Sequence, residues 1–509
     1  MEDKSRSLAL LLILLLGTCV SAQHAIISGE NAPERELRGV WMATVLNIDY
    51  PQNPTTDAAT LQADFRSQLY RLRQAGMNAI FVQVRPAADA LYPSVHAPWS
   101  EWLTGVQGRA PVSNFDPLAY MIETAHAQGI ELHAWINPYR VAMTLDSTRF
   151  AANHLYHRHR DWIRSYGGRR YLDPGLPAVR AHLGEVIDEL ITKYDLDGIH
   201  FDDYFYPYPV PGVDFPDQQT YRTYGYGRSL ADWRRDNVNT FIAETHRRIK
   251  AAKPWMYFGV SPFGVWRNQA QDPVNGSPTN AGATSYDGLY GDALAWARAG
   301  TVDYLLPQIY WSMDHPAASY RTLVSWWTTH VPPGPDLYIG HAAYKAGTDP
   351  DPAWTGTEEL PRQVAHLRQL PRPKGSVFFS SKSLLNNPAG LAQRLTQLYT
   401  TPALLPARRA PGSATPVAVR VFKPKATEQG TLLVWEMDEQ IPKAQLPHYF
   451  AIYRSRPGQT ATLLHRTPYG QACYRYHYFD DRAQTGMEYQ YRVVPLDRYH
   501  RSLETVVAR

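Results

Sequence analysis

The stretches GIELHAWINPYR at residues 129–140 and DGIHFDDYFY at residues 197–206 decide the fold. In each stretch apolar and polar residues alternate, which is typical of a β-strand whose successive side chains point to opposite faces. Polar residues gather where each apolar run ends. A longer amphipathic segment separates the two stretches, at residues 177–194, so strand-like and helix-like patterns follow one another.

The same alternation repeats along most of the chain. Strand-like runs occupy residues 38–49, 78–85, 129–140, 197–206, 256–264, 302–311, 337–344 and 376–381. Helix-like segments occupy residues 57–75, 117–128, 177–194, 230–252, 287–299, 317–330, 358–369 and 389–399. Eight such units predict an α/β fold, a closed (β/α)8 TIM-like barrel. The rival, an open doubly wound sheet, usually has a glycine-rich phosphate turn after its first strand, and this sequence has none there.

The chain changes character near residue 400. TTPALLPARRAPGSATP at residues 400–416 is typical of a linker. Beyond it, strand-like runs such as TLLVWEM at residues 431–437 predict a small all-β sandwich. Trp435 and GMEYQYRVV resemble a fibronectin type III domain, in which Tyr489 or Tyr491 would anchor a corner. We therefore predict a signal peptide at 1–22, the barrel at 23–402, a linker at 403–414 and a fibronectin type III-like domain at 415–509.

The first residues have the form of a secretory signal peptide. Basic residues precede an apolar run at residues 8–16, and small residues follow up to Ala22. Lipid attachment at Cys19 is an alternative to simple cleavage. No later segment has the ~20 apolar residues of a membrane helix. We expect an exported protein, in the periplasm or associated with the outer membrane or cell envelope, without a transmembrane segment. Cys473 is then the remaining cysteine, so no intramolecular disulfide is expected.

Composition limits the partners that we expect. The chain has 509 residues, a net charge of +4 and no long run of Lys or Arg, so we expect no nucleic-acid partner. Its 14 Trp and 33 Tyr suit stacking on sugar rings, but a Tyr-rich core and sandwich explain them equally well.

Strand alternation directs a set of polar side chains into the barrel, at the ends of five strand-like runs. This set consists of Arg85, Asn137, Asp202, Ser261, Gln308 and Tyr310. Because barrel active sites lie at the C-terminal ends of the strands, we expect these side chains to share one cleft. His133 and His200 also point inward, either as hydrogen-bonded core residues or as ligand contacts.

Cleavage of a glycosidic bond commonly uses two carboxyl groups. Asp202 is the first candidate, and Asp203 joins it only if the strand has already ended. The alternatives for the second group are Asp314 and Asp89, each of which follows a strand-like run and would otherwise be a solvated loop residue. Glu131 and the other acids at strand beginnings lie on the face that contributes to stability.

Other residues are candidates for substrate binding. Arg85 either pairs with an aspartate or binds a substrate carboxylate by a bidentate contact. Asp89 would bind a sugar hydroxyl if it is not catalytic. Tyr139, Tyr310 and Trp311 offer rings on which sugars can stack.

Eight motifs occur in an order that resembles the glycosyl-hydrolase-like 10 family of bacterial envelope proteins. They are RGVWMATVLNIDYP, QVRPAADALYPS, APWSEWLTG, HAWINPYR, LDPGLPAVR, DGIHFDDYFYP, FGVSPFGVWRN and LPQIYW. The resemblance covers roughly residues 36–400. It implies a TIM-like barrel and glycosidase activity on a polysaccharide, with peptide-free peptidoglycan strands as the substrate of relatives. The motif positions are Arg85, Asp89, His133, Asn137, Asp202, Asp203 and Gln308.

One departure bears on mechanism. DGIHFDDY also resembles a signature of chitinase-like barrels, whose acid would fall at Tyr204, which is not a carboxylate. We therefore do not expect the substrate-assisted mechanism of those enzymes.

Three functions follow from these patterns. The leading hypothesis is an exported glycoside hydrolase of an envelope amino-sugar glycan, without cofactor or metal ligands. A non-catalytic glycan-binding or scaffold protein is the second. The third is a metal-dependent hydrolase or deacetylase that uses His133, His200, Asp202 and Asp203, although alternation leaves only His200 and Asp202 on one face.

Overall fold

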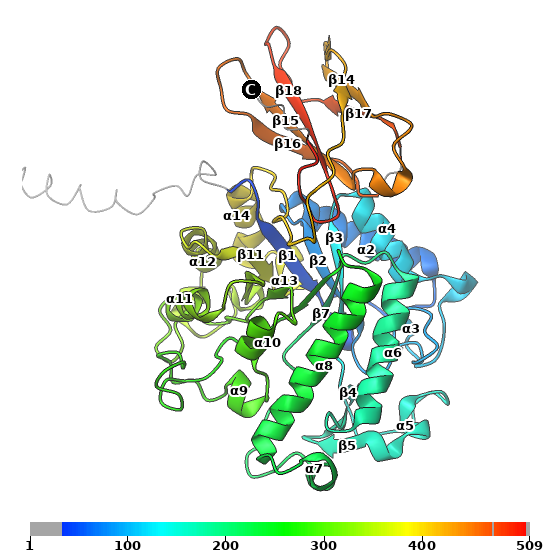
Figure 1. Cartoon of the computed structure of the whole chain (residues 1–509), viewed down its shortest axis with the longest axis vertical. Helices are drawn as coiled ribbons and strands as arrows, with labels where there is room; N and C mark the ends of the chain where they lie inside the picture. The colour runs from blue at the N-terminus through cyan, green and yellow to red at the C-terminus, as the bar shows by residue number, and fades with distance from the viewer. Residues whose placement is uncertain (1–32, 471–472, 505–509) are drawn as a thin grey trace, which may run out of the picture.

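The computed structural model describes residues 33–470 and 473–504. Eight parallel strands close into a barrel in chain order, and helices surround it (Figure 1). The strands are β1 (Leu37–Met42), β2 (Ala79–Arg85), β3 (Glu131–Ile136), β7 (Gly198–Phe201), β8 (Tyr257–Val260), β9 (Tyr304–Leu305), β10 (Asp336–His341) and β11 (Pro373–Phe378). The predicted (β/α)8 barrel is confirmed. The predicted signal peptide and Cys19 lie outside the described residues.

The outer layer contains a helix for every predicted helical segment. These helices are α2 (Ala58–Gln74), α4 (Pro117–Ala127), α6 (Pro177–Lys193), α8 (Leu230–Ala252), α10 (Ala293–Ala299), α11 (Tyr320–His330), α12 (Glu359–Leu367) and α14 (Leu391–Leu398). Side-chain caps fix several starts: Asp57 accepts a hydrogen bond from the Thr60 amide at α2, and Ser229 from the Asp232 amide at α8. Their apolar faces and the outward side chains of the strands form one core. None of the helices within the described residues is both long and apolar enough to cross a membrane.

Short elements fill the connections between the strands and the outer helices. They are α3 (Glu101–Thr104), β4 (Arg140–Ala142), α5 (Leu155–Arg158), β5 (Ile163–Tyr166), β6 (Arg169–Leu172), α7 (Gln218–Tyr224), α9 (Ser285–Gly288) and α13 (Ser381–Leu385). Strands β4, β6 and β5 pair in a small antiparallel sheet, which is formed by the chain segment that connects β3 to α6. This sheet and α7 lie at the end of the barrel remote from the C-terminal part of the chain (Figure 1).

The C-terminal part forms two antiparallel sheets. One contains β12 (Arg420–Val421), β13 (Lys425–Thr427), β14 (Gly430–Glu436) and β17 (Arg475–Asp480), and the other contains β15 (Tyr449–Ser455), β16 (Thr462–Arg466) and β18 (Gln490–Leu496). Trp435, Phe450 and Tyr476 share a buried cluster drawn from both sheets. Tyr491 donates a hydrogen bond to Asp480 at 2.7 Å, and Tyr489 accepts one from the Gln484 amide at 3.4 Å. The relation to fibronectin type III domains stays a prediction.

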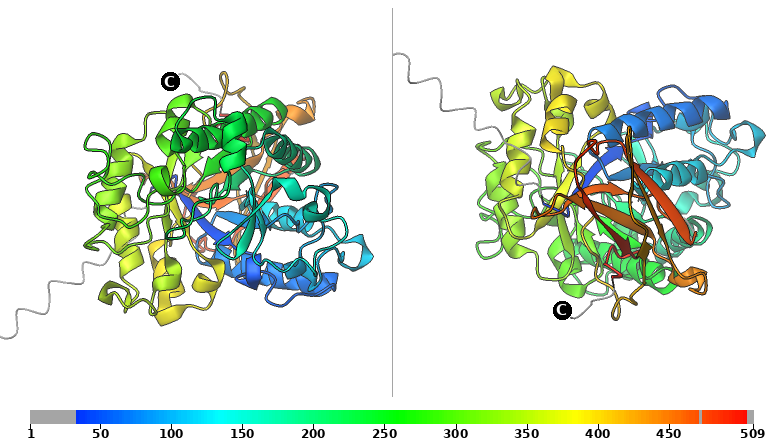
Figure 2. Two further views of the ribbon diagram at one scale, coloured as in Figure 1. Left: turned by 90° about the horizontal axis from the view of Figure 1, so that it is seen from below. Right: turned by 90° about the horizontal axis from the view of Figure 1, so that it is seen from above.

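The sandwich sits on the N-terminal ends of the barrel strands, as the views along the barrel show (Figure 2). Leu405, in the segment predicted as a linker, is buried inside this end of the barrel. Arg408 donates two hydrogen bonds to Glu131 at the start of β3, at 2.6 and 2.5 Å, and His500 approaches Glu131 at 2.8 Å. Burial raises the pKa of Glu131, but the charges of Arg408 and His500 outweigh this effect and hold it well below its usual value.

This buried ion pair predicts a large effect on stability. We expect Arg408→Ala to lower the free energy of unfolding by about 3–5 kcal/mol, because Glu131 would keep its charge in a buried site without its guanidinium partner. The exposed neighbour Arg409 provides the control, and Arg409→Ala should change the free energy by less than about 0.5 kcal/mol. Urea titration followed by tryptophan fluorescence measures both. Equal stability of the two variants would contradict the expectation.

Candidate active site

A cavity of about 500 Å³ opens at the C-terminal ends of the barrel strands. Aromatic side chains make up much of its wall, among them Trp41, Trp135, Tyr204, Tyr208, Phe263, Tyr310, Trp311, Tyr344 and Phe379. The polar lining includes Gln83, Arg140, Asp202, Ser261, Gln308 and Lys345. Aromatic faces with a few convergent polar groups are typical of a sugar-binding cavity.

Asp202 lies directly after β7, and three donors hold its carboxylate. Asn137, after β3, donates to Oδ2 in a short hydrogen bond, and Trp135 Nε1 donates to the same oxygen at 3.3 Å. The amide of Tyr204 donates to Oδ1 at 3.3 Å. Asn137 is itself held by Gln83 of β2, whose amide group donates to it at 2.5 Å. Three neighbouring strands therefore fix the position of this carboxylate.

Asp203 is buried beside Asp202 because the regular strand ends at Phe201. The Tyr208 hydroxyl donates to its Oδ2, and Gln308 Nε2 lies 3.4 Å from its Oδ1. Gln308 reaches this place because the strand resumes after Pro307 and bridges both Phe263 and Gly340. Both donors line the cavity, whereas Asp203 does not, so its carboxyl group lies directly behind the part of the wall that Tyr208 and Gln308 form.

The two carboxyl groups shift each other's titration. Burial raises the pKa of Asp202 to about 6, against the lowering effect of Arg140 and its hydrogen-bond donors. Burial and the charge of Asp202 raise the pKa of Asp203 to about 7. Near neutral pH this arrangement favours an ionised Asp202 next to an Asp203 that still holds its proton. Two neighbouring acids with separated pKa values are the arrangement that acid catalysis requires.

Two cations border the cavity. Arg140 donates to the backbone oxygen of Pro86 at 3.1 Å and its guanidinium lies 4.9 Å from the ring centre of Tyr204. Lys345 also lines the wall, on the loop after β10, and forms an ion pair with Asp349 at 3.0 Å. Both cations lie where they can attract an anionic group on a substrate.

Several predicted site residues line the cavity together with Asp202. The Ser261 hydroxyl shares a hydrogen bond of 3.1 Å with His200 Nε2, and Gln308 donates one to the Ser261 backbone oxygen at 2.9 Å. Tyr310 and Trp311, predicted as sugar platforms, also line the cavity. Asn137 is fully buried immediately behind Asp202.

Other predicted residues lie outside the lining. Arg85 is buried behind the residues that line the cavity, because the register of β2 and β3 shifts between Gln83 and Arg85. Its guanidinium donates to the backbone oxygens of Asn137 and Pro138. Asp89 is buried beneath the following loop, where burial raises its pKa to about 6. Tyr139 packs on Phe241 in the helix-facing core. Asp314 is 71% exposed and pairs with Arg321 at 3.0 Å, so the structure does not bring it to Asp202.

The two inward histidines belong to a hydrogen-bonded layer beneath the cavity. His133 Nδ1 and His200 Nδ1 lie 3.1 and 3.0 Å from the Tyr304 hydroxyl, and His200 Nε2 faces Ser261 and the Trp41 indole. His133 Nε2 lies 3.4 Å from Glu131 Oε2, so none of the four ring nitrogens faces Asp202 or Asp203. The geometry does not support a metal held by His133, His200, Asp202 and Asp203.

Sequence reasoning missed the contributions of the loops. Tyr208, Phe263, Tyr344, Lys345 and Phe379 line the cavity but were not among the predicted site residues. Phe263, Tyr344 and Phe379 fall within the predicted strand-like runs, but each lies beyond the end of its regular strand, where alternation no longer decides the direction of a side chain. Tyr208 lies in the aromatic and proline-rich continuation of DGIHFDDYFY.

The hydroxyl of Tyr208 gives a selective test of the Asp203 environment. A hydrogen bond to an ionised carboxylate lowers its pKa, so Tyr208→Phe should raise the pKa of Asp203 further. We expect the titration of the Asp203 carboxyl group, followed by carbon-13 NMR, to move to higher pH in this variant. Tyr344→Phe, in the same wall but without this bond, is the control. An unchanged profile in Tyr208→Phe would show that the hydroxyl does not act on Asp203.

The closed barrel, the carboxyl pair at its catalytic end and the aromatic cavity together define the class of glycoside hydrolase-type barrels. Comparison with known proteins agrees with this class. The profile of the family described as Glycosyl hydrolase-like 10 matches residues 36–356. The glycosyl hydrolase YngK of Bacillus subtilis is 42% identical over 497 residues, 96% of each chain. The glycosyl hydrolase DigH of Escherichia coli K12 is 41% identical over 375 residues, 69% of this chain and 84% of that protein. The chain therefore belongs to the Glycosyl hydrolase-like 10 family.

Among solved structures, the glycoside hydrolase domain of PgaB (BpsB) from Bordetella bronchiseptica aligns with a TM-score of 0.46 at 16% identity. The alignment covers 72% of this chain and 99% of that chain.

Proposed function

We propose that this protein hydrolyses glycosidic bonds of an amino-sugar glycan, and that peptidoglycan glycan strands are its substrate. The observation that carries the proposal is the buried carboxyl pair of Asp202, in the wall of an aromatic cavity, and Asp203, held directly behind that wall by Tyr208 and Gln308. Membership of a glycosyl hydrolase-like family supports the reaction class.

The environments of the two acids suggest a division of roles. Asp203 keeps its proton to higher pH because of burial and the adjacent charge, so it acts as the acid that protonates the leaving oxygen. Asp202 is held by three donors, so it acts in the ionised form and stabilises the positive charge that develops on the sugar ring. Gln83 and Asn137 are positioning residues that keep Asp202 in place.

The cavity wall also fits the proposed substrate. Pyranose rings would stack on faces such as Tyr310 and Trp311. Arg140 and Lys345 offer positive charge to the lactyl carboxylate of muramic acid residues, which neutral glycans lack.

We further propose that the protein acts outside the cytoplasm. The support is the sequence of residues 1–22, with its basic start, apolar run and small residues before the cleavage point. Lipid attachment at Cys19 remains the alternative form of anchoring. Mass measurement of the protein isolated from membrane and soluble envelope fractions separates the two.

The direct test is incubation of the purified protein with peptide-free glycan strands, followed by mass spectrometry of soluble products. We expect soluble oligosaccharides without peptides and with new reducing ends. We expect the same products when the protein has been treated with EDTA. Binding of the strands without product release would instead support the non-catalytic glycan-binding function. Loss of product formation after metal removal would support the metal-dependent hydrolase.

A further inference from the structure

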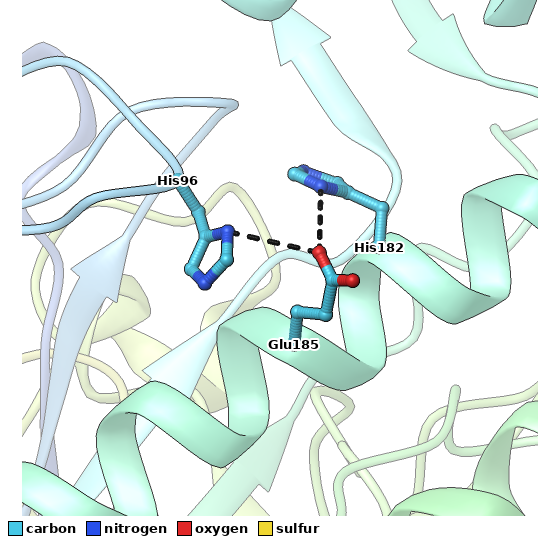
Figure 3. Close-up of side chains that lie close together, drawn as sticks. All are labelled: His96, His182 and Glu185. Atoms are coloured by element: carbon cyan, nitrogen blue, oxygen red, sulfur yellow. Dashed lines mark ion pairs between the residues drawn. The ribbon is translucent and has the colours of Figure 1, made fainter.

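A second cluster of chemically competent side chains lies outside the candidate active site. His182 and Glu185 project from α6, and His96 comes from the loop between β2 and α3 (Figure 3). The two rings flank one carboxylate oxygen: His96 Nδ1 lies 3.8 Å and His182 Nδ1 4.0 Å from Glu185 Oε2. Two elements distant in sequence thus bring three potential ligands together.

The geometry points to a site for a divalent transition metal of the Zn²⁺ class, held by His96, His182 and Glu185. One ligand atom from each residue lies within 4.8 Å of the other two. A point equidistant from three such atoms is no more than about 2.8 Å from each, whereas Zn–N and Zn–O bonds measure about 2.0–2.2 Å. Small side-chain rotations, without movement of α6, close this difference.

The surroundings favour metal binding over a simple ion pair. In the part of the chain that the structure describes, Glu185 forms ion pairs with these two histidines and with no Lys or Arg. The His182 side chain is only 10% exposed.

The donor set selects the kind of metal. Two imidazoles and one carboxylate suit zinc and its neighbours, whereas Mg²⁺ and Ca²⁺ prefer oxygen ligands. Three protein ligands leave a coordination position for water, on the side where Glu185 is exposed.

The proposed metal would clamp the loop between β2 and α3 to α6. This loop is already tied to the same helix further along, where Ser94 and the Val95 amide bond to Glu189 at 2.6 and 2.9 Å. It also carries Asp89, next to the buried Arg85 that supports the Asn137 turn. The metal thus adds a second attachment of this loop, outside the cavity and without a role in the chemistry.

Isothermal titration with ZnCl₂ of the full chain, without a histidine tag and after treatment with EDTA, tests the site. We expect saturable binding of one equivalent, a higher unfolding temperature with Zn²⁺, and no binding of Mg²⁺. His182→Asn and Glu185→Gln should each weaken binding at least about tenfold. His157→Asn, which changes an exposed histidine outside the cluster, should leave it unchanged.

Circular dichroism of the metal-free variants shows whether they fold. If His182→Asn does not fold, Glu185→Gln still tests the site, because it changes only an exposed side chain. X-ray absorption at the zinc edge should show two imidazole nitrogens in the wild-type protein. The proposal is overturned if the wild type shows no saturable Zn²⁺ binding, or if a folded His182→Asn or Glu185→Gln variant binds as tightly as the wild type.

Discussion

Asp202→Asn is expected to lower kcat/KM on peptide-free glycan strands by about 10³-fold or more, which corresponds to about 4 kcal/mol of transition-state stabilisation. The substitution keeps the shape of the side chain but removes the negative charge that faces the developing positive charge on the sugar. It also places an amide where Asn137 and Trp135 donate hydrogen bonds. Substrate binding should be retained, because the aromatic wall is untouched.

The matched control is Asp314→Asn, which removes an exposed carboxylate near the same end of the barrel. We expect this variant to keep wild-type kcat/KM. The rates of the two variants are compared by the initial release of reducing ends. Their binding is measured separately, by sedimentation with insoluble glycan. A normal rate in a folded Asp202→Asn variant would remove Asp202 from the mechanism.

Asp203→Asn is expected to lower kcat/KM on the same strands by about 10²- to 10⁴-fold, because the leaving oxygen would lose its proton donor. The loss should depend on the leaving group. An aryl glycoside with a strongly acidic phenol needs no protonation, so its cleavage should fall much less than that of the natural linkage. Equal losses on both substrates would show that Asp203 has a structural and not an acid role.

The fold could be predicted from the sequence because its pattern is local and repeated. Runs such as residues 129–140 and 197–206 alternate in polarity, and amphipathic helix patterns lie between them, several of which start at a capping residue. The strand containing Tyr304 shows the limit of this reasoning. Ten residues had a strand-like pattern, but Pro307 interrupts the ladder, and regular pairing covers only Tyr304–Leu305.

The site was predicted where regular alternation holds. It directed Asn137, Asp202, Ser261 and Gln308 toward one cleft. In the structure Asp202, Ser261 and Gln308 line the cavity, and Asn137 lies directly behind Asp202. Alternation also directed Arg85 into the cleft, which is wrong, because the register shift between β2 and β3 moves that residue behind the lining.

Positions in loops depend on long-range contacts that periodicity does not contain. Asp203 turns into the site because β7 ends at Phe201, and Tyr208 and Lys345 arrive on connections. Tyr139 follows β3 but packs outward on Phe241, while Asp314 lies on a solvated turn beside Arg321. The positions of side chains beyond the end of a strand therefore cannot be predicted from alternation and are known only from the structure.

The most direct test of the paired-carboxyl account is the pH dependence of kcat/KM on peptide-free glycan strands, for the wild type and Asp203→Asn. Asp202 must be ionised, so activity should rise as pH increases through about 6, and Asp203 must be protonated, so activity should fall as pH increases through about 7. The account predicts a narrow bell for the wild type and no high-pH decline in the residual activity of Asp203→Asn. A wild-type profile that is flat across this range, or a high-pH decline that persists in Asp203→Asn, would contradict it.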